Sequence, residues 1–139
     1  MSLKTYNFKD VAVIFGTRAL SGIAEGGVQI TRLTDSFTDQ VGADGEVVRS
    51  RTNDKRGDAV VNLLQSSDSN DYLSESMVAD ENTGAGVKPL TIKDNSGRTL
   101  AFARQAWVVK PAASALGREA GERAWTIRCA DLDIFVGGN

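Results

Sequence analysis

Acidic side chains near the C-terminus are the residues whose type and spacing could support chemistry. Asp131 and Asp133 are two residues apart, so in a β-strand they would share one face. Glycoside hydrolases use such a carboxylate pair as acid and base when the two groups sit in different environments. Carboxylates that face solvent or a channel are the simpler interpretation. A hydrolase is the alternative, and it lacks a nucleophile and base to support it.

A second acidic group, Asp68 to Asp71, superficially resembles the start of a calcium-binding loop. An EF-hand loop that began at Asp68 would need glycine at its sixth position, where this chain has Leu73. Helix capping explains the cluster better, because Ser, Asn and Asp side chains accept hydrogen bonds from the free N–H groups of a first helical turn. The sequence predicts a helix over about 68–81, with Leu73 and Met77 on one face.

The chain has no histidine and one cysteine, which removes most catalytic and metal-binding arrangements. Histidine is the commonest general base and metal ligand, and a structural zinc site needs a cluster of Cys or His. Cys129 lies in an apolar stretch, so we expect a buried, unreactive thiol. Neither of the usual glycine-rich phosphate-binding motifs occurs. The sequence therefore predicts a protein that is not an enzyme and holds no metal or cofactor.

Length and composition indicate one globular domain over residues 1–139. Hydrophobic residues make up 41% of the chain and charged residues 24%, which is typical of a folded domain. A net charge of −2 lacks the excess of Lys and Arg that tight nucleic-acid binding requires. The first residues show no signal-peptide pattern, and no apolar run approaches the ~20 residues that span a bilayer. We therefore expect folding in a reducing cytoplasm and no membrane partner.

Short runs of alternating apolar residues predict a mostly β fold. Val47–Arg51 and Ala59–Leu64 are expected to pair across the polar loop Thr52–Gly57. In the run 99–109, one face is expected to carry Leu100, Phe102, Ala106 and Val108. With the helix on its flank, the expected architecture is a β-sandwich or partly closed barrel of about seven or eight strands and one α-helix.

Residues 124–136 are expected to form one long strand whose buried face changes along its length. Apolar residues alternate on one face at Trp125, Ile127 and Cys129, then on the opposite face at Leu132, Ile134 and Val136. A strand has a period of two, so this change needs a bulge or a second buried surface. A second buried surface suits a sheet that packs on its own core and also on a neighbouring subunit, which suggests assembly.

The segment from Asp39 to Lys55 carries charges of both signs around two turn glycines, Gly42 and Gly45. A solvated loop is one interpretation. The other is an extended arm that pairs with another subunit, because mixed charges set register and partner choice. The candidate subunit-interface residues are Asp39, Asp44, Glu46, Arg49, Arg51, Asp54, Lys55 and Arg56.

Several segments, taken in order, resemble the tail tube proteins of contractile-tailed bacteriophages. The similarity rests on strand and loop motifs and covers nearly the whole chain. It is carried by Tyr6–Val11, Val41–Ser50, Leu64–Leu73, Ala106–Pro111 and the closing Trp125, Gly137 and Gly138. Type VI secretion and pyocin tube proteins are similar in fold, so a subunit of one of those tubes is an alternative.

The resemblance implies a structural virion protein whose homohexameric rings stack into the inner tail tube, a helical assembly made in the bacterial host cytoplasm. Strands of each subunit would join a continuous inner barrel, residues 35–57 would be the stacking arm, and the helix would lie outside, towards the sheath. The implied partners are other copies of the chain, the tail sheath protein, the tape-measure protein, the baseplate and tail-terminator proteins, and phage DNA that passes through the lumen without sequence-specific binding.

Passage of DNA sets an expectation for the charge of the channel. An arginine on a phosphate track adds salt-dependent affinity, so the lumen should present acidic or neutral side chains. Acidic residues outnumber basic ones only 18 to 16, so the bias has to come from where the side chains are placed. Arg49, Arg51 and Arg56 are therefore expected at subunit contacts.

A monomeric β-barrel that binds a small ligand in its mouth is the alternative from another functional class. The aromatic residues are two Trp, two Tyr and five Phe, and most of them fall in expected strands. Few are left to line a cavity, so assembly into a tube is the preferred hypothesis.

Overall fold

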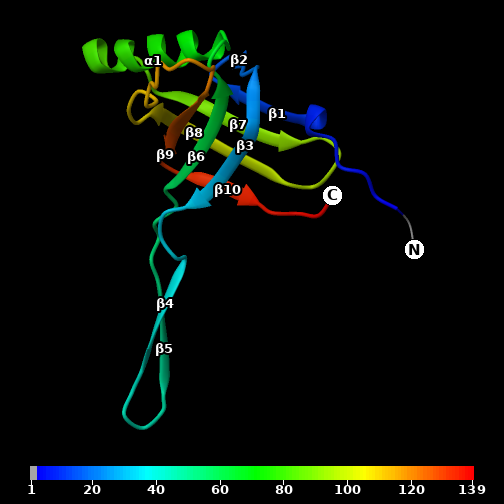
Figure 1. Ribbon diagram of the computed structural model, residues 1–139. Helices are drawn as coiled ribbons and strands as arrows, with labels where there is room; N and C mark the ends of the chain where they lie inside the picture. Colours follow the sequence, from blue (N-terminus) through cyan, green and yellow to red (C-terminus); the bar gives the residue numbers. More distant parts are fainter. Residues whose placement is uncertain (1–2) are drawn as a thin grey trace.

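The computed structural model describes residues 3–139 and shows a mostly β protein with one α-helix and a long protruding hairpin (Figure 1). The expected mostly β fold with a single flanking helix is confirmed. The elements are the 3-10 turn Phe8–Asp10, β1 (Val11–Phe15), β2 (Arg18–Ala19), β3 (Ile23–Arg32), β4 (Phe37–Val41), β5 (Val47–Arg51), β6 (Gly57–Leu64), α1 (Ser69–Thr83), β7 (Lys88–Asp94), β8 (Leu100–Val108), β9 (Glu122–Cys129) and β10 (Leu132–Phe135).

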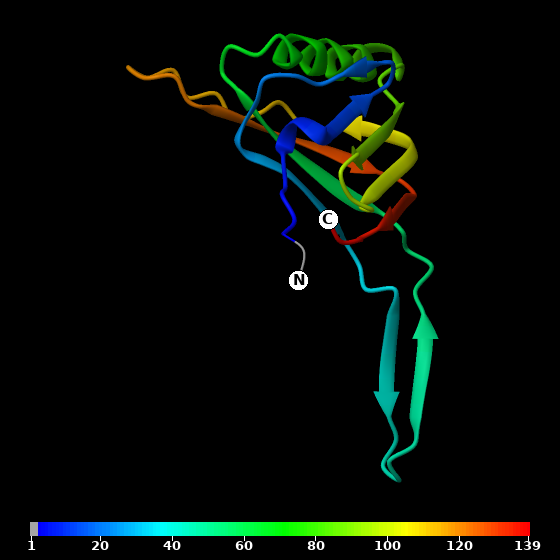
Figure 2. The ribbon, with the colours of Figure 1, turned by 90° about the vertical axis from the view of Figure 1, so that its right-hand side faces the viewer.

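Eight strands form the main sheet, in the order β2-β1-β7-β8-β9-β6-β3, with β10 also paired to β8. Neighbouring strands are antiparallel throughout. The sheet curls strongly, but within residues 3–139 it ends at β2 and β3 and does not close into a barrel (Figure 2). β4 and β5 form a separate two-stranded sheet.

The expected pairing of Val47–Arg51 with Ala59–Leu64 is wrong. β5 pairs with β4, from Phe37 opposite Arg51 to Val41 opposite Val47, whereas β6 pairs with β3 and β9. The polar segment between β5 and β6 is therefore not a hairpin turn. It leads the chain from the hairpin back to the main sheet, beside the segment that leaves β3. The amide of Leu33 donates to the carbonyl of Arg56 at 3.0 Å across this junction.

The change of buried face near the C-terminus comes from a bend shared by two strands. β9 and β10 follow β8 in one register, with Cys129 opposite Ala106 and Leu132 opposite Ala103, and they are separated by a bend at Ala130–Asp131. The buried positions are three residues apart on both strands, so both strands bend together and keep Cys129 and Leu132 in the same core. The interpretation as a second buried surface is therefore wrong.

The same bend corrects the expected face of β8. Ala106 and Val108 are buried, whereas Leu100 and Phe102 are exposed, because the bend offsets the two halves of the strand. The exposed pair is continued across the sheet by Phe135, which lies opposite Leu100. An apolar patch therefore lies outside the core at this end of the body.

The core is a single cluster of buried side chains from β1, β6, β7, β8, β9 and β10, with Leu73 of α1 packed into it. Polar bonds fix the helix on this cluster: Tyr72 Oη donates to the carbonyl of Phe15 at 2.7 Å, and Trp125 Nε1 donates to Asn70 Oδ1 at 2.8 Å. The helix lies across one end of the curled sheet, and the β4–β5 hairpin leaves from the opposite end (Figure 1).

Candidate assembly surfaces

A two-stranded arm, residues 33–56, extends from the body and contains β4 and β5 (Figure 2). Every residue of both strands is exposed. Four of them are large and apolar, with relative exposures between 42% and 66%: Phe37, Val41, Val47 and Val48. An isolated two-stranded hairpin is only marginally stable in water, because it has no core on which to bury such side chains. The arm therefore presents apolar surface that its own chain does not cover.

The register of the arm sorts its side chains into two faces, because directly paired residues lie on the same side. One face carries Phe37, Asp39, Val41, Val47, Arg49 and Arg51. The guanidinium groups of Arg49 and Arg51 lie 4.3 Å and 5.6 Å from the centroid of the Phe37 ring, in cation–π contact. The two arginines are therefore held near the base of the arm, and the valine pair lies further out.

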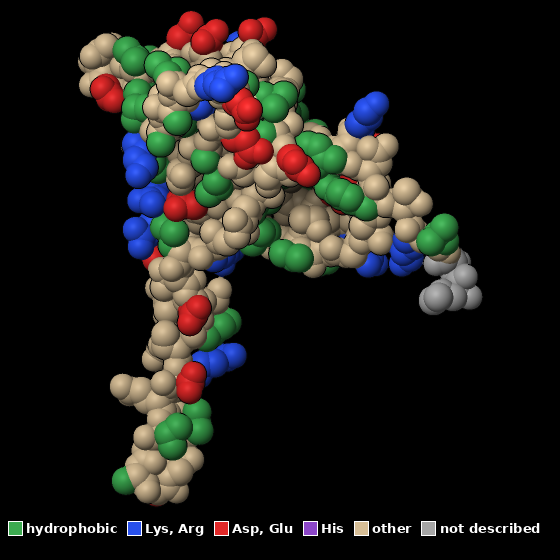
Figure 3. Space-filling model, in the orientation of Figure 1, with side chains coloured by type: hydrophobic (Ala, Val, Ile, Leu, Met, Phe, Trp, Pro, Cys, Tyr) green, Lys and Arg blue, Asp and Glu red, His purple; other side chains and the backbone are tan. Residues whose placement is uncertain are grey.

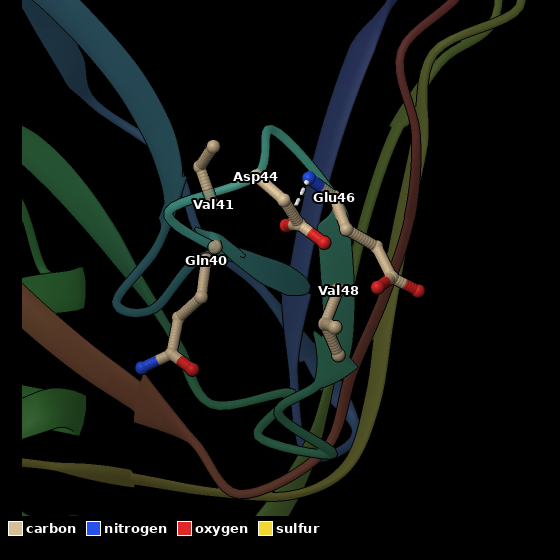
Figure 4. Close-up of a pocket in the computed structure, with 6 residues that line it drawn as sticks. Gln40, Val41, Asp44, Glu46 and Val48 are labelled. Carbon is tan, nitrogen blue, oxygen red and sulfur yellow. Dashed lines mark hydrogen bonds between the residues drawn. The ribbon is translucent and has the colours of Figure 1, made fainter.

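The arm tip, which we define as residues 40–48, is acidic. Gly42 N–H donates to the carbonyl of Glu46 at 2.7 Å, and Gly45 takes a φ of 90°, where a side chain would be strained. The carboxylate of Asp44 accepts from the amide of Glu46 at 3.1 Å, and the Glu46 carboxylate points away from the turn (Figure 4). The tip holds a hollow of ≈ 490 Å³ lined by Gln40, Val41, Gly42, Asp44, Glu46 and Val48.

The root of the arm is fixed by a bonded pair, Asp54 and Arg56. The guanidinium of Arg56 donates from Nε and Nη2 to the two Asp54 oxygens, both at 3.0 Å, and Thr34 Oγ1 donates to the same carboxylate at 2.8 Å. These bonds, that of the Arg56 side chain first, hold the pKa of Asp54 well below its usual range, and the pair raises the pKa of Arg56. The two sides of the root are joined again where Thr52 N–H donates to the Ser36 carbonyl at 3.0 Å.

The root is also joined to β10. Lys55 Nζ lies 3.3 Å from Asp133 Oδ1, and the amide of Leu132 donates to the carbonyl of Lys55 at 2.8 Å. Arg32 Nη2 donates to the carbonyl of Leu132 at 2.6 Å. The arm therefore leaves the body through a well-bonded junction, whereas the hydrogen bonds described for the tip all lie within the hairpin itself.

Two adjoining hollows at this junction share Arg32 and Lys55, and we call them together the root groove. The first, of ≈ 280 Å³, is also lined by Ser36, Phe37, Arg51, Thr52, Asn53 and Asp54. The second, of ≈ 340 Å³, is also lined by Leu100, Phe102, Asp133, Ile134 and Phe135. The groove therefore places basic groups beside the exposed apolar patch of β8 and β10.

The eight predicted interface residues fall into two groups in the structure. The arm strands and tip carry Asp39, Asp44, Glu46, Arg49 and Arg51, and the root carries Asp54, Lys55 and Arg56. Their contact with another subunit stays a prediction. Sequence reasoning missed Arg32, Leu100, Phe102 and Phe135, which reach the groove from distant strands. The three-residue spacing of Ala103 and Ala106, repeated at Cys129 and Leu132, is the signal that would have placed Leu100 and Phe102 outside.

The residues first considered for chemistry, Asp131, Asp133 and Cys129, lie in different environments. Asp131 lies in the bend before β10, so it does not share a strand face with Asp133, which is paired with Lys55. Cys129 is buried, and desolvation, with a smaller contribution from Asp58, raises the pKa of its thiol to about 11. Among residues 3–139, no three His, Cys, Asp or Glu side chains are grouped as metal ligands would be. No helix of the same part of the chain is long and apolar enough to cross a membrane.

Comparison with known proteins gives matches over almost the full chain. Residues 3–137 match a family model described as the Bacteriophage PhiTE tail tube protein. Structural protein ORF10 of Pseudomonas phage KPP10 is 34% identical over 131 residues, which cover 88% of this chain and 73% of that protein.

Two solved structures share the fold at low identity. The anti-feeding prophage cap, which terminates the AFP tube, matches with a TM-score of 0.60 and 9% identity over 97% of this chain and 94% of the other. The PVC sheath/tube terminator of an extracellular contractile injection system, in its extended state, matches with a TM-score of 0.63 and 10% identity, over 98% and 100%.

Proposed function

The chain belongs to the bacteriophage PhiTE tail tube protein family, a family of phage structural proteins, and from this premise we propose that it builds the inner tail tube of a contractile-tailed phage. In this proposal six copies form a ring, the rings stack into a tube, and phage DNA passes through the lumen. The single observation that carries the proposal is the exposed arm, whose apolar and charged side chains find no partner surface in the described part of their own chain.

The open sheet supports ring formation. Within residues 3–139 the sheet ends at β2 and β3, and β3, a strand of ten residues, pairs there on one side only. An unpaired strand edge offers backbone N–H and C=O groups to another chain. Closing such edges between copies in a ring removes them, while a separate axial contact that does not close produces a filament.

The charge distribution suits a tube between a sheath and DNA. α1 carries Asp71, Glu75, Asp80 and Glu81 and no basic residue, and acidic side chains gather at the α1 end of the visible face (Figure 3). We assign this end to contact with the sheath protein. On the open face of the sheet, Arg128 is paired with Asp58, at 2.9 Å between Nε and Oδ1, so this arginine is already neutralised. Tape-measure, baseplate and tail-terminator proteins complete the proposed set of partners.

A terminal ring that closes the tube is the second candidate, favoured by the cap and terminator structures that share the fold. The two roles differ in copy number. A tube subunit recurs in every ring along the tail, whereas a terminator is present in one ring. Quantitative mass spectrometry of purified virions separates them: we expect the copy number to scale with tail length, and a count near one ring would favour the terminator.

Electron microscopy of the purified protein over a range of concentrations tests tube formation itself. We expect six-fold rings at low concentration and stacked tubes at high concentration, because one chain carries both the sheet edges proposed to close a ring and the arm proposed to stack the rings. A protein that sediments as a monomer at every concentration and shows neither rings nor tubes contradicts the proposal.

A further inference from the structure

The arm tip and the root groove carry opposite charge. Asp44 and Glu46 are the only charged residues of the tip. The two carboxylates of the groove, by contrast, each have a cationic partner already. The ion pairs formed among residues 3–139 do not involve Arg32 or Arg51, so both guanidinium groups can donate to the carboxylate of another molecule. The free charge of the groove is therefore basic, and that of the tip is acidic.

Arg32 is the group in the groove that most directly indicates an acidic ligand. Its Nη2 donates to the carbonyl of Leu132 at 2.6 Å and its Nη1 to Ser36 Oγ at 3.4 Å, which are both neutral acceptors. Its Nε is buried and has no hydrogen-bond partner among residues 3–139. Hydrogen bonds between a guanidinium and a carboxylate are shorter and stronger than those to neutral oxygens. The Arg32 guanidinium forms none of the ion pairs among residues 3–139, and a carboxylate that entered the groove would supply a charged partner for it.

The two surfaces also match in apolar character. The tip exposes Val41, Val47 and Val48, and the groove exposes Leu100, Phe102 and Phe135 at 37% to 63%. Exposed apolar area beside unpaired charge is characteristic of a surface that another molecule covers. Contact between tip and groove would bury both apolar sets together and bring Asp44 and Glu46 to the basic side chains.

The tip does not reach the groove of its own chain. β4 and β5 are paired over five residues each, and at about 3.3 Å per residue this holds the tip roughly 15 Å or more beyond the root. An arm tip that enters the groove must therefore belong to a different copy, displaced along the arm. Tip and groove are different surfaces, so the contact is heterologous and repeats from copy to copy.

We propose that the arm tip of one copy docks into the root groove of a neighbouring copy. This inference rests on the proposed tube assembly and names the receptor of the arm within it. Asp44 and Glu46 bind the guanidinium groups of Arg32 and Arg51, and the tip valines pack on the apolar patch of β8 and β10.

Cross-linking tests this contact in the assembled protein. Ala43→Cys places a thiol at the tip, Val136→Cys places one beside the groove, and the native Cys129 is buried and unreactive. A chain with both substitutions, treated with a short bismaleimide, should give a ladder of covalent multimers. The matched control combines Ala43→Cys with Glu81→Cys on the exposed surface of α1, and it should give no ladder. An assembled protein with no tip-to-groove ladder overturns the docking and leaves the tube proposal intact, whereas a protein that never assembles overturns both.

Charge exchange provides the second measurement. Asp44→Lys with Glu46→Lys should lower the cross-linked fraction about tenfold, and Arg32→Glu added to the same chain should restore it. Phe135→Asp changes an exposed position and leaves the hydrogen bonds of Arg32 in place. It should also lower the cross-linked fraction, and it provides the test if Arg32→Glu does not fold. An unchanged cross-linked fraction in the lysine variant or in Phe135→Asp contradicts the docking.

Discussion

The body and the arm of this protein are stabilised by different means. In the body, side chains from six strands and one helix form a continuous buried cluster, and polar groups under the helix are hydrogen-bonded. In the arm, every strand residue is exposed, and Phe37 makes cation–π contacts with Arg49 and Arg51 instead of packing into a core. The body can therefore fold alone, whereas the arm needs a second molecule to bury its apolar side chains.

The boundary between these two regions is the bonded root, and it shows how the chain separates folding from assembly. Asp54, Arg56 and Thr34 hold the two sides of the excursion together, and Thr52 joins them again one step further out. Beyond that point the arm adds little to the stability of the body. Changes beyond the root should consequently alter assembly and leave folding alone.

Removing the arm gives the largest expected effect. Ser36 and Thr52 are already hydrogen-bonded, so Phe37–Arg51 can be replaced by Asn-Gly, which favours a tight hairpin turn. We expect assembly to be lost and the free energy of unfolding of the body to change by no more than about 1 kcal/mol. Sedimentation and urea unfolding measure the two quantities. Long tubes from this variant, or a body that no longer folds, would break the division between the two regions.

Matched truncations in the body and the arm give the next largest difference. Ile127→Ala removes a fully buried side chain from β9 and should cost about 2–5 kcal/mol of stability, because it leaves a cavity. Val47→Ala, in the arm, should change stability by at most about 0.5 kcal/mol and should weaken assembly instead. Urea unfolding measures the free energy of unfolding of both variants. Equal destabilisation would show that the arm unfolds cooperatively with the body.

The thiol of Cys129 reports on the body alone. Burial raises its pKa from 9.0 to about 11, so the folded state retains the proton that the unfolded state releases. Stability from the buried neutral thiol is present below pH 9 and is lost as the pH rises from 9 towards 11. Native protein should resist thiol reagents at pH 8, and the arm-deleted variant should resist them equally. Faster labelling after removal of the arm would show that the arm protects the core.

The root should give the smallest and most local effect. Because the folded-state pKa of Asp54 is lowered, its contribution is present above the ordinary value of 3.8 and is lost as the pH falls below it, through the folded-state pKa. Arg56→Gln removes the largest cause, so the pKa of Asp54 should rise towards 3.8. NMR titration of the Asp54 carboxyl carbon measures this change, with Lys55→Gln as the control. An unchanged pKa in Arg56→Gln would mean that the bonds from Thr34 Oγ1 and from the backbone amide of residue 56 are enough to hold the carboxylate.

Local patterns in the sequence predicted the parts of the fold that depend on neighbouring residues. The Ser, Asn and Asp cluster before Leu73 indicated a helix over about 68–81, and the structure has one at Ser69–Thr83. The expected cap is only partly present, because the Asp68 side chain makes no cap hydrogen bond, whereas Ser67 Oγ accepts from the amide of Ser69 at 3.2 Å. The mixed charges around Gly42 and Gly45 indicated either a loop or an arm, and the structure has a paired hairpin there. Both features depend on residues that are close together in the sequence, so a short segment is enough to predict them.

The features that could not be predicted depend on contacts between distant segments. The shared bend of β8 with β9 and β10 requires both strands at once, so the pattern of one strand alone placed Leu100 and Phe102 in the core. The root groove brings Arg32 beside Phe102 and Phe135, a juxtaposition set by the order of the strands. No alternation along one segment contains that information.

Hydrogen exchange, measured on the free subunit and on the assembled protein, tests the division between body and arm most directly. The amides of β6, β8 and β9 should be protected in both states, because the core and its sheet are complete in one chain. The amides of β4 and β5 should exchange rapidly in the free subunit and become protected on assembly. Arm amides that exchange equally fast in the assembled protein would contradict the account, and so would arm amides that are already fully protected in the monomer.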